Sequence, residues 1–280
     1  MKTAIVLGTF DGLHAGHRAV IEKANGFYSI AVTFDIPPKG YMSGNPQLLM
    51  LPSERERRLK MLGIDRVEIQ NFEKVKDIEA LEYLELLKEK YNPQRIICGF
   101  NYAFGKGAKG NKGLICDFCK KNNIEFICVP PVSNGEKIVS STYIRQLIRD
   151  GEMEEASAQI YGGFSFTAPV IHGDARGRNL GFPTANQEYP QDLVDLKFGV
   201  YISRVTIDGK QYDAITNIGH RPTYKTETVG CETFIKGFSN DIYGKQMTTE
   251  LVRFVREEKK FSSIDELKSA ILNDVKLLDI

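Results

Sequence analysis

Two kinds of hydrophobic pattern divide the chain near its middle. In the first half, short apolar runs typical of buried strands alternate with stretches of helical spacing. The predicted strands are residues 3–7, 29–34, 66–69, 95–98 and 125–129, and the predicted helices are residues 16–25, 53–61 and 77–91. Ser53 is the predicted N-cap of the second helix, and the third has the apolar positions Ile78, Leu81, Leu84 and Leu87. Such alternation predicts an α/β domain over residues 1–160, with a mostly parallel sheet covered on both faces.

The second half has short alternating runs instead. They cover residues 164–172, 199–207, 211–218, 231–238 and 248–255. The pair Asp208-Gly209 between two of them is a hairpin signal. The pattern predicts a small antiparallel β-barrel over residues 161–280, followed by a helix that Ser262 or Ser263 caps and that ends near Leu277. The boundary is expected around Gly162-Gly163, after a predicted helix over residues 152–159.

Composition narrows the class of protein. The 280 residues include 37 Lys and Arg and 36 Asp and Glu, so the formal net charge is +1. This balance gives no support for bulk nucleic-acid or acidic-membrane binding, and no apolar run approaches the ~20 residues of a membrane span. Five cysteines make no disulfide scaffold. The C-x-x-C at Cys116 and Cys119 lacks a second ligand pair, so both are interpreted as incidental cysteines on a helix. We expect a cytoplasmic protein whose oligomeric state the sequence leaves open.

A loop rich in glycine and histidine follows the first predicted strand. Residues 8–17 read G-T-F-D-G-L-H-A-G-H and hold His14 and His17, two of the four histidines in the chain. Glycines let the backbone turn sharply and approach a ligand closely, and the N-terminus of the following helix favours an anion. H-x-G-H is neither the dinucleotide fingerprint nor a P-loop. The loop is a candidate phosphate site; the plainer alternative is a turn with incidental histidines.

Hydroxyl side chains and an arginine mark the end of the first half. Residues 140–145 read S-S-T-Y-I-R at the start of a predicted helix. Taken alone, Ser and Thr are ordinary N-caps and Arg145 could be a surface charge. Hydroxyls and amides at a helix N-terminus, with an arginine one turn on, also suit a triphosphate. The basic segment over residues 105–113 is either a phosphate-side loop or a solvated loop.

The most distinctive pattern of the second half is G-D-A-R-G-R-N-L-G-F-P-T-A-N over residues 173–186. Thr184 and Asn186 are two residues apart, so in an extended chain their side chains lie on one side. Hard oxygen ligands in that arrangement suit Mg²⁺ that bridges nucleotide phosphates. In isolation, such a segment could equally be a connection between strands.

The first half resembles the nucleotidylyltransferase superfamily, in its H-x-G-H and its S-S-T-x-I-R segments. The segments G-F-N-Y-A-F-G (residues 99–105) and T-F-D (33–35) are similar to those of bacterial FAD synthetases, although the family's Pro-His-Pro is Ile36-Pro37-Pro38 here. The resemblance implies a Rossmann-like domain and catalytic roles for His14, His17 and Arg145. It further implies ATP binding and flavin binding by two sets of residues: Gly8, Phe10, Asp11, Gly16, Ser141 and Thr142 for ATP, and Asn101 and Phe104 for the flavin.

The second half resembles the riboflavin kinases. The carrying segment is G-R-N-L-G-F-P-T-A-N over residues 177–186, and similar segments follow at residues 198–201, 217–223, 231–235, 241–244 and 254–261. The resemblance implies that Glu232 is the base and that Arg256 lies near the flavin. It also implies a site for ATP with Mg²⁺ at Gly177, Arg178, Thr184 and Asn186, with Thr184 and Asn186 as metal ligands. Phe234, Gly237 and Gly163 depart from the family pattern.

The two resemblances cover nearly the whole chain and predict one bifunctional enzyme. The C-terminal half would phosphorylate riboflavin with ATP to FMN, and the N-terminal half would adenylylate FMN with ATP to FAD and pyrophosphate. The expected cofactor is Mg²⁺ with ATP, and the expected partners are ATP, riboflavin, FMN and FAD, without nucleic acid or membrane. One alternative is an adenylyltransferase whose barrel only binds flavin. Another is a non-enzymatic flavin-binding or regulatory protein.

Overall fold

The computed structural model describes residues 2–134, 137–173, 177, 181–222 and 227–279. Contacts divide the chain into two units. The first comprises residues 1–144 and 159–161, and the second comprises residues 145–158 and 162–280. Each unit is described by itself. The domain limits at residues 160 and 161 stay a prediction; by contacts, residues 145–158 group with the second unit.

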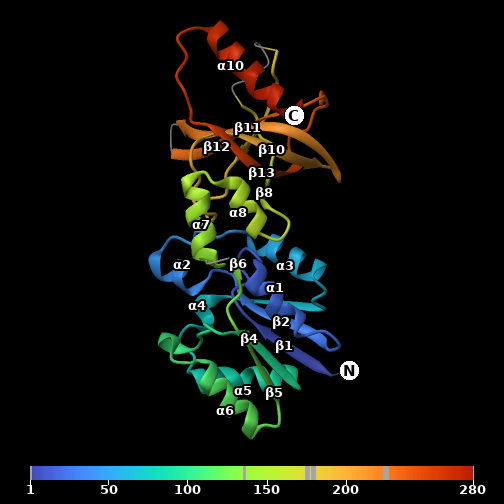
Figure 1. The fold of residues 1–280 in the computed structure, drawn as a ribbon, viewed down its shortest axis with the longest axis vertical. Helices are drawn as coiled ribbons and strands as arrows, with labels where there is room; N and C mark the ends of the chain where they lie inside the picture. Colours follow the sequence, from blue (N-terminus) through green and yellow to red (C-terminus); the bar gives the residue numbers. More distant parts are fainter. Residues whose placement is uncertain (1, 135–136, 174–176, 178–180, 223–226, 280) are drawn as a thin grey trace. The chain divides into compact units, whose positions relative to one another are not determined.

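The first unit is built on a five-stranded parallel sheet, which confirms the predicted α/β class (Figure 1). The strand order is β3-β2-β1-β4-β5. The strands are β1 (Thr3–Leu7), β2 (Tyr28–Phe34), β3 (Arg66–Gln70), β4 (Arg95–Gly99) and β5 (Glu125–Val129). The helices are α1 (Ala15–Glu22), α2 (Pro38–Ser43), α3 (Pro52–Met61), α4 (Phe72–Val75), α5 (Ala80–Tyr91) and α6 (Lys112–Lys121), with the short turn η1 (Lys106–Ala108). A small hairpin, β6 (Ser133–Asn134) and β7 (Lys137–Ile138), follows β5.

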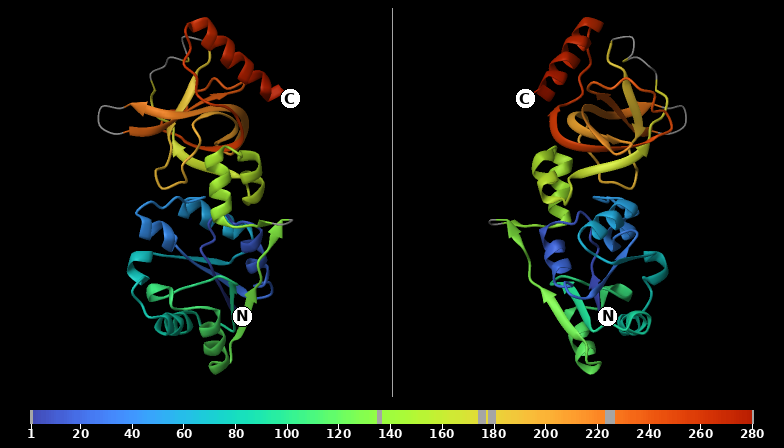
Figure 2. Two further views of the ribbon diagram at one scale, coloured as in Figure 1. Left: turned by 60° about the vertical axis from the view of Figure 1, so that its left-hand side comes forward. Right: turned by 90° about the vertical axis from the view of Figure 1, so that its right-hand side faces the viewer.

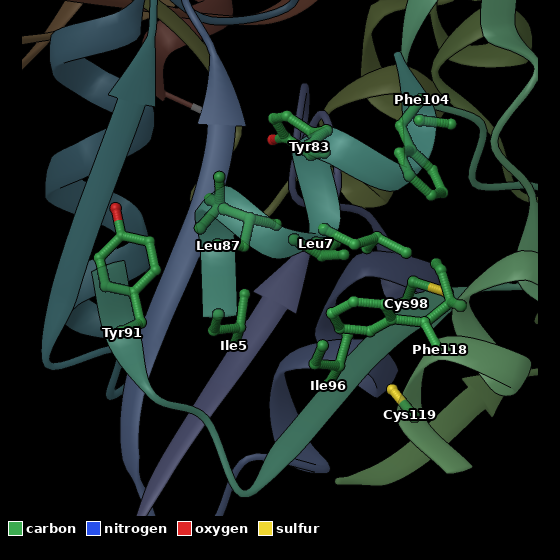
Figure 3. Close-up of a cluster of buried hydrophobic side chains, with 14 of the residues drawn as sticks. Ile5, Leu7, Tyr83, Leu87, Tyr91, Ile96, Cys98, Phe104, Phe118 and Cys119 are labelled. Carbon is green, nitrogen blue, oxygen red and sulfur yellow. The ribbon is translucent and has the colours of Figure 1, made fainter. Parts of the chain in front are cut away.

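Helices cover both faces of this sheet, as a parallel sheet requires. Alternate residues of β1 point to opposite faces, and Ala4, Ile5, Val6 and Leu7 are all buried. The Ile5 and Leu7 face packs against α5 and α6 in one apolar cluster (Figure 3). The cluster also takes in Phe104, Tyr83, Leu87, Tyr91, Ile96, Cys98, Phe118 and Cys119. The strand runs read from the sequence therefore form the core of the unit.

Two details of the predicted helices were wrong. Ser53 is not an N-cap, because Leu51 holds that position and Pro52 occupies the first helical turn, where its missing N–H is harmless. The helix predicted from Asp77 begins at Ala80, and Leu81 is 53% exposed while Tyr83 is buried. Spacing by three drifts off one face of a helix with 3.6 residues per turn, so the tyrosine takes the core position instead.

The second unit contains α7 (Ser141–Asp150, of which residues 145–150 belong here), α8 (Met153–Gln159) and a six-stranded antiparallel sheet. The strand order is β8-β13-β10-β11-β12-β9. The strands are β8 (Phe164–Pro169), β9 (Thr184–Glu188), β10 (Gly199–Ile207), β11 (Lys210–Pro222), β12 (Glu227–Ile235) and β13 (Gln246–Arg256). The sheet curls until its two edges meet, where the Ile171 amide donates to the Asn186 carbonyl at 2.8 Å (Figure 2). The predicted antiparallel barrel class is confirmed.

The ends of this unit follow the predicted local signals. The turn between β10 and β11 is Asp208-Gly209, both with positive φ, which is the geometry of a type I′ hairpin. Ser263 caps the last helix, α10 (Ile264–Lys276), by accepting from the Glu266 amide, and the turn η2 (Leu277–Asp279) follows. The strand β9 was not predicted as a strand, because its alternation is hidden by the polar side chains that it carries.

Candidate active sites

The first candidate site lies at the carboxyl edge of the parallel sheet. The strand order places β1 beside β4, while the chain runs outward from β1 to β2 and β3 and then from β4 to β5. Ligands of open α/β sheets bind where the strand order reverses in this way. The loop after β1 carries residues 8–17, and the loop after β4 carries Asn101 and Phe104. The topology therefore brings together two segments that the sequence singled out separately.

The loop after β1 is held in a strained conformation. Phe10 and Leu13 have φ of 49° and 44°, which non-glycine residues rarely adopt, and both side chains are fully buried. The Phe10 ring lies against Gly8, where a Cβ would meet it at 2.8 Å. The buried carboxylate of Asp11 accepts from the amides of Leu49 and Met50 at 2.9 and 3.2 Å. Asp11 thus anchors the loop through its side chain, and its proposed contact with ATP stays a prediction.

His14 and His17 form one stacked pair. Their ring centroids lie 3.8 Å apart, and the Nδ1 atoms of both are buried without a hydrogen-bond partner. Burial, with a smaller contribution from Arg18, lowers the pKa of His14 to about 4. Burial, together with the charges of His14 and Arg55, lowers the pKa of His17 well below its usual value. Both imidazoles are therefore neutral near pH 7, with ring nitrogens available for an incoming ligand.

Glycine at position 16 lets the second histidine approach the first. A Cβ on Gly16 would meet the His14 ring at 3.1 Å, tighter than an ordinary contact. His17 packs edge-on against Phe10, with centroids 5.4 Å apart. The H-x-G-H spacing thus has a packing reason in addition to the chemical one.

The S-S-T-x-I-R segment reaches the same loop through its hydroxyl. The Ser141 Oγ donates to the Asp11 carbonyl at 2.8 Å, and the Ser140 Oγ accepts from the Tyr143 amide as a helix cap. Thr142 is exposed, and Arg145 is half-buried one turn into α7. Arg145 groups with the second unit by contacts, so its role in adenylyl transfer stays a prediction.

The two predicted flavin residues of the first unit have different surroundings. Asn101 is exposed in the turn after β4, whereas Phe104 is 4% exposed and packs beside Tyr102 and Tyr83. Figure 3 shows Phe104 within the apolar cluster. Phe100, which the sequence reasoning did not select individually, is 38% exposed beside Asn101. An exposed aromatic ring at this edge is a better surface for a planar ligand than the buried Phe104.

The second candidate site lies on the strands of the barrel. Glu232 on β12 is the register partner of Asn186 on β9 and of Asn217 on β11. Directly paired residues of neighbouring strands share one face of the sheet. Thr184 pairs with Phe234, two residues along from Glu232, so it lies on that face too. Glu232 is exposed, and Asn186 is 6% exposed. The register brings the predicted base and both predicted metal ligands together.

Two glycines allow the backbone to pass close to these polar residues. A Cβ on Gly173 would meet the Asn186 amide at about 2.5 Å, and a Cβ on Gly177 would meet the Phe182 carbonyl at 2.3 Å and the Thr184 Oγ1 at 3.4 Å. The donor set of one hydroxyl and one amide oxygen is of the hard kind that Mg²⁺ prefers. The residues present therefore fit a magnesium ion bound with ATP. Arg178, the other predicted ATP ligand, lies outside the described residues.

The predicted flavin residue of the barrel is held by the last helix. The Arg256 guanidinium forms an ion pair with Asp274 of α10 at 2.7 Å, and Asp274 is buried. Glu258, two residues after Arg256, accepts from the side-chain amide of Asn217 at 3.1 Å. Gly219 permits this approach, since a Cβ there would meet the Glu258 carboxylate at 2.1 Å. Asn217 and Glu258 thus join Glu232 on one face, although neither was a predicted site residue.

The departures from the riboflavin kinase pattern have local structural reasons. Phe234 packs edge-on against Phe182, with centroids 5.6 Å apart. Gly237 and Gly163 have positive φ, and a Cβ on Gly163 would meet the Glu250 carboxylate at 2.7 Å. Phe234 thus contributes packing, and Gly163 and Gly237 permit a backbone conformation that favours glycine.

Arg55 is the residue of the first unit that the sequence reasoning missed. It is fully buried on α3, and its guanidinium donates to the carbonyls of Thr9, Phe34 and Asp35. The stretch S-E-R-E-R-R over residues 53–58 is so charged that it indicates a solvated helix, and nothing in it distinguishes Arg55 from its neighbours.

All five cysteines are free thiols, and Cys116 and Cys119 lie on α6, a helix as predicted. Within the described ranges, no group of three or more His, Cys, Asp or Glu side chains could hold a metal ion.

Comparisons with known proteins match both halves. The FAD synthetase family model matches residues 1–143, and the riboflavin kinase family model matches residues 162–279. Bifunctional riboflavin kinase/FMN adenylyltransferases of Listeria monocytogenes serovar 1/2a and Bacillus subtilis strain 168 are each 29% identical to the chain. Each alignment covers 98% of this chain and 90% of the relative.

A solved structure from Streptococcus pneumoniae superposes on nearly the whole chain. It has a TM-score of 0.88 and 31% identity, and the match covers 99% of this chain and 94% of that one. That protein is named a macrolide-efflux protein. The name applies to that protein and differs from what both family matches indicate for this chain. In the part of this chain that the structure describes, no helix has the length and apolar character of a membrane span.

Proposed function

The chain belongs to the FAD synthetase family, and from this premise we propose that each of its two sites carries one of two successive phosphoryl-transfer reactions. It is a transferase with riboflavin kinase and FMN adenylyltransferase activities, which act on riboflavin, FMN and ATP and yield FAD. The observation that carries the proposal is the pair of family matches, each of which covers one candidate site. The adenylyltransferase-only alternative does not explain why the second half matches the riboflavin kinase family.

In the first unit, we assign adenylyl transfer to the carboxyl edge of the parallel sheet. An oxygen of the FMN phosphate attacks the α-phosphorus of ATP, the bond to the β-phosphate breaks, and pyrophosphate leaves. His14 and His17 contribute hydrogen bonds to the phosphate oxygens on which charge develops, aided by Ser141, Thr142 and Arg145. Preorganised donors of this kind lower the barrier because they need no reorganisation during the reaction. Gly8, Phe10, Asp11 and Gly16 shape the loop against ATP. Asn101 forms the flavin side, with the exposed ring of Phe100 next to it in sequence, and the buried Phe104 supports this turn from the apolar cluster.

In the second unit, we assign riboflavin phosphorylation to the exposed face that carries Glu232. Thr184 and Asn186 would hold Mg²⁺ with ATP, and the bound ion would neutralise phosphate charge. Glu232 accepts a hydrogen bond, and then the proton, from the ribityl 5′-hydroxyl, whose oxygen attacks the γ-phosphorus as ADP leaves. Gly177 and Arg178 complete the nucleotide side, and Arg256 lies on the flavin side.

One incubation tests the proposed function. The purified chain receives riboflavin, ATP and Mg²⁺, and chromatography separates riboflavin, FMN and FAD. Formation of FMN followed by FAD supports the bifunctional assignment. FAD from added FMN, without FMN from riboflavin, supports the adenylyltransferase-only alternative, and no turnover with either flavin overturns both. EDTA in a matched sample checks the divalent metal. The cytoplasmic location and the absence of a nucleic-acid partner stay predictions from the sequence.

A further inference from the structure

We propose that Arg55 is a positioning residue of the adenylyl transfer, which fixes the loop of His14 and His17 by joining the carboxyl ends of β1 and β2. The inference rests on the proposed function of the first unit and extends it to a residue outside every motif. Arg55 comes from α3, 46 residues along the chain from Thr9, the loop residue that it holds.

The hydrogen bonds of Arg55 connect the carboxyl ends of β1 and β2 directly. Its Nη1 donates to the carbonyl of Thr9, two residues beyond the end of β1, at 3.0 Å. Its Nη2 donates to the Phe34 carbonyl, at the last residue of β2, and to the Asp35 carbonyl at 3.0 Å. The planar guanidinium presents donors in a fixed fork, so the two strand ends are held at a set separation. A lysine could supply the charge but not this fork.

The hydrogen bond from Arg55 to Thr9 lies next to the strained part of the loop. The Thr9 carbonyl also accepts from the Thr33 Oγ1 at 2.9 Å, so the peptide between Thr9 and Phe10 is held from two sides. Phe10 then adopts its left-handed conformation and packs its ring against His17. Strained backbone persists only where its surroundings over-determine it. The contacts therefore run from Arg55 through Thr9 and Phe10 to the imidazole of His17.

Arg55 also acts on His17 through its charge. The charged or titratable groups that bear on His17 are His14, from the same loop, and Arg55, from α3; both lower the pKa of His17. Asp11 and Asp35 bear on Arg55 in turn, and Arg18 bears on His14. Burial is the largest cause of the lowered pKa of His17, and the charge of Arg55 adds to it. We therefore expect the pKa of His17 to rise when the guanidinium is removed. Because looser packing would raise it too, Arg55→Lys, which retains the charge, separates the electrostatic effect from lost packing.

The test compares Arg55→Met with Arg58→Met in the full chain. Arg58 is a matched control because it lies on the same helix and is 2% exposed, but it pairs with Glu54 and the Tyr161 carbonyl instead of the strand ends. We measure kcat and KM of FAD formation from FMN between pH 5 and 9, the rate of FMN formation, thermal unfolding, and the pKa of His17 by NMR.

We expect Arg55→Met to lower kcat by about 10²-fold, the order that a misplaced catalytic group costs, with a smaller change of KM. The pKa of His17 should rise, and FMN formation should stay unchanged. Arg58→Met should lower the unfolding temperature without moving the pKa of His17. Arg55→Lys retains the charge and tests the fork if Arg55→Met does not fold: it should leave the pKa of His17 low and still reduce kcat about tenfold.

Two results overturn the inference while the proposed function stands. In one, the wild-type chain makes FAD from FMN, and Arg55→Met changes kcat and the pKa of His17 no more than Arg58→Met does. The other is an Arg55→Lys variant with unchanged kcat. If the wild-type chain makes no FAD from FMN, the proposed function itself fails, and the two failures are thereby distinguished.

Discussion

The two units bury polar side chains of different kinds. The first unit buries charged or titratable groups near its candidate site: Asp11, His14, Arg55 and Arg58 are each at most 8% exposed. The barrel interior of the second unit buries neutral groups. Ser203, Thr216 and Thr233 form a chain of hydroxyl hydrogen bonds across β10, β11 and β12, and Gln187 and Thr249 form another pair. Its buried carboxylate, Asp274, is paired with Arg256.

This difference follows from where each fold places its chemistry. A parallel sheet offers its strand ends, so the first site is made of loops that need buried charges to hold them. A curled antiparallel sheet offers the side chains of the strands themselves, and the ladder register then fixes the distances. Glu232, Asn186 and Asn217 need no buried charge to meet, since they are register partners. The first site should therefore depend strongly on pH and buried charge, and the second on register.

The largest expected effect is on the kinase, for Glu232→Gln. Glutamine has the size and one acceptor oxygen of glutamate but takes no proton at neutral pH. Loss of a general base slows turnover by about 10²–10⁴-fold, whereas FAD formation from FMN should be unchanged. Rates of FMN and FAD formation, measured separately, check this. A loss of tenfold or less would make Glu232 a positioning group, and an unchanged kinase would remove it from the site.

The next largest effect is on the adenylyltransferase, for His17→Ala. The change removes a donor aimed at phosphate oxygens, which costs about 10²–10³-fold in rate, while FMN formation from riboflavin should be retained. His172→Ala, at an exposed histidine of the second unit, is the matched control for loss of an imidazole. Equal loss of both activities in His17→Ala would indicate misfolding and not a role in one site.

A smaller effect concerns the stability of the first unit against pH. The pKa of His14 is about 4 in the folded chain and about 6.5 when unfolded, so below pH 6.5 the unfolded state binds the extra proton. Stability should be complete above pH 6.5 and fall as the pH is lowered toward 4, by about 3 kcal/mol at most from His14 alone. His17, whose pKa is also lowered, adds a loss of the same sign. Urea unfolding of the full chain across this range checks the slope.

His14→Gln provides the control for this pH effect. The variant has no titrating group at position 14 and keeps His17, so its stability should change less between pH 7 and 4.5 than that of the wild-type chain. An unchanged slope would mean that the buried imidazole is not the group that titrates, and the contrast between charged and neutral interiors would lose its clearest consequence.

The smallest effect tests the packing of the last helix on the barrel. Ser263→Ala removes the cap that accepts from the Glu266 amide, which costs about 1 kcal/mol. Ser269→Ala, at an exposed position inside α10, should be near neutral. Thermal unfolding separates the two variants. Equal unfolding temperatures would show that α10 contributes little to the stability of the second unit.

Local sequence signals predicted the bounds of strands better than they predicted which strands pair and in what register. The strands at residues 3–7, 125–129 and 199–207 have the bounds that their apolar runs predicted, because burial and β propensity act locally. The opposition of Glu232 to Asn186 depends on which strands pair and in what register, and alternation along one strand specifies neither. Arg55 was missed for a related reason: its guanidinium is held by carbonyls at or just beyond the ends of β1 and β2, which lie 20 or more residues away in sequence.

One measurement tests most directly the claim that two separate sites act in succession. His17→Ala and Glu232→Gln are prepared as full chains and incubated with riboflavin, ATP and Mg²⁺, each alone and then mixed. Each variant alone should make FAD slowly, for opposite reasons. The mixture should form FAD near the wild-type rate per active site, because FMN released by one variant is adenylylated by the other. A mixture no faster than the sum of its parts, with FMN accumulating freely, would contradict the account.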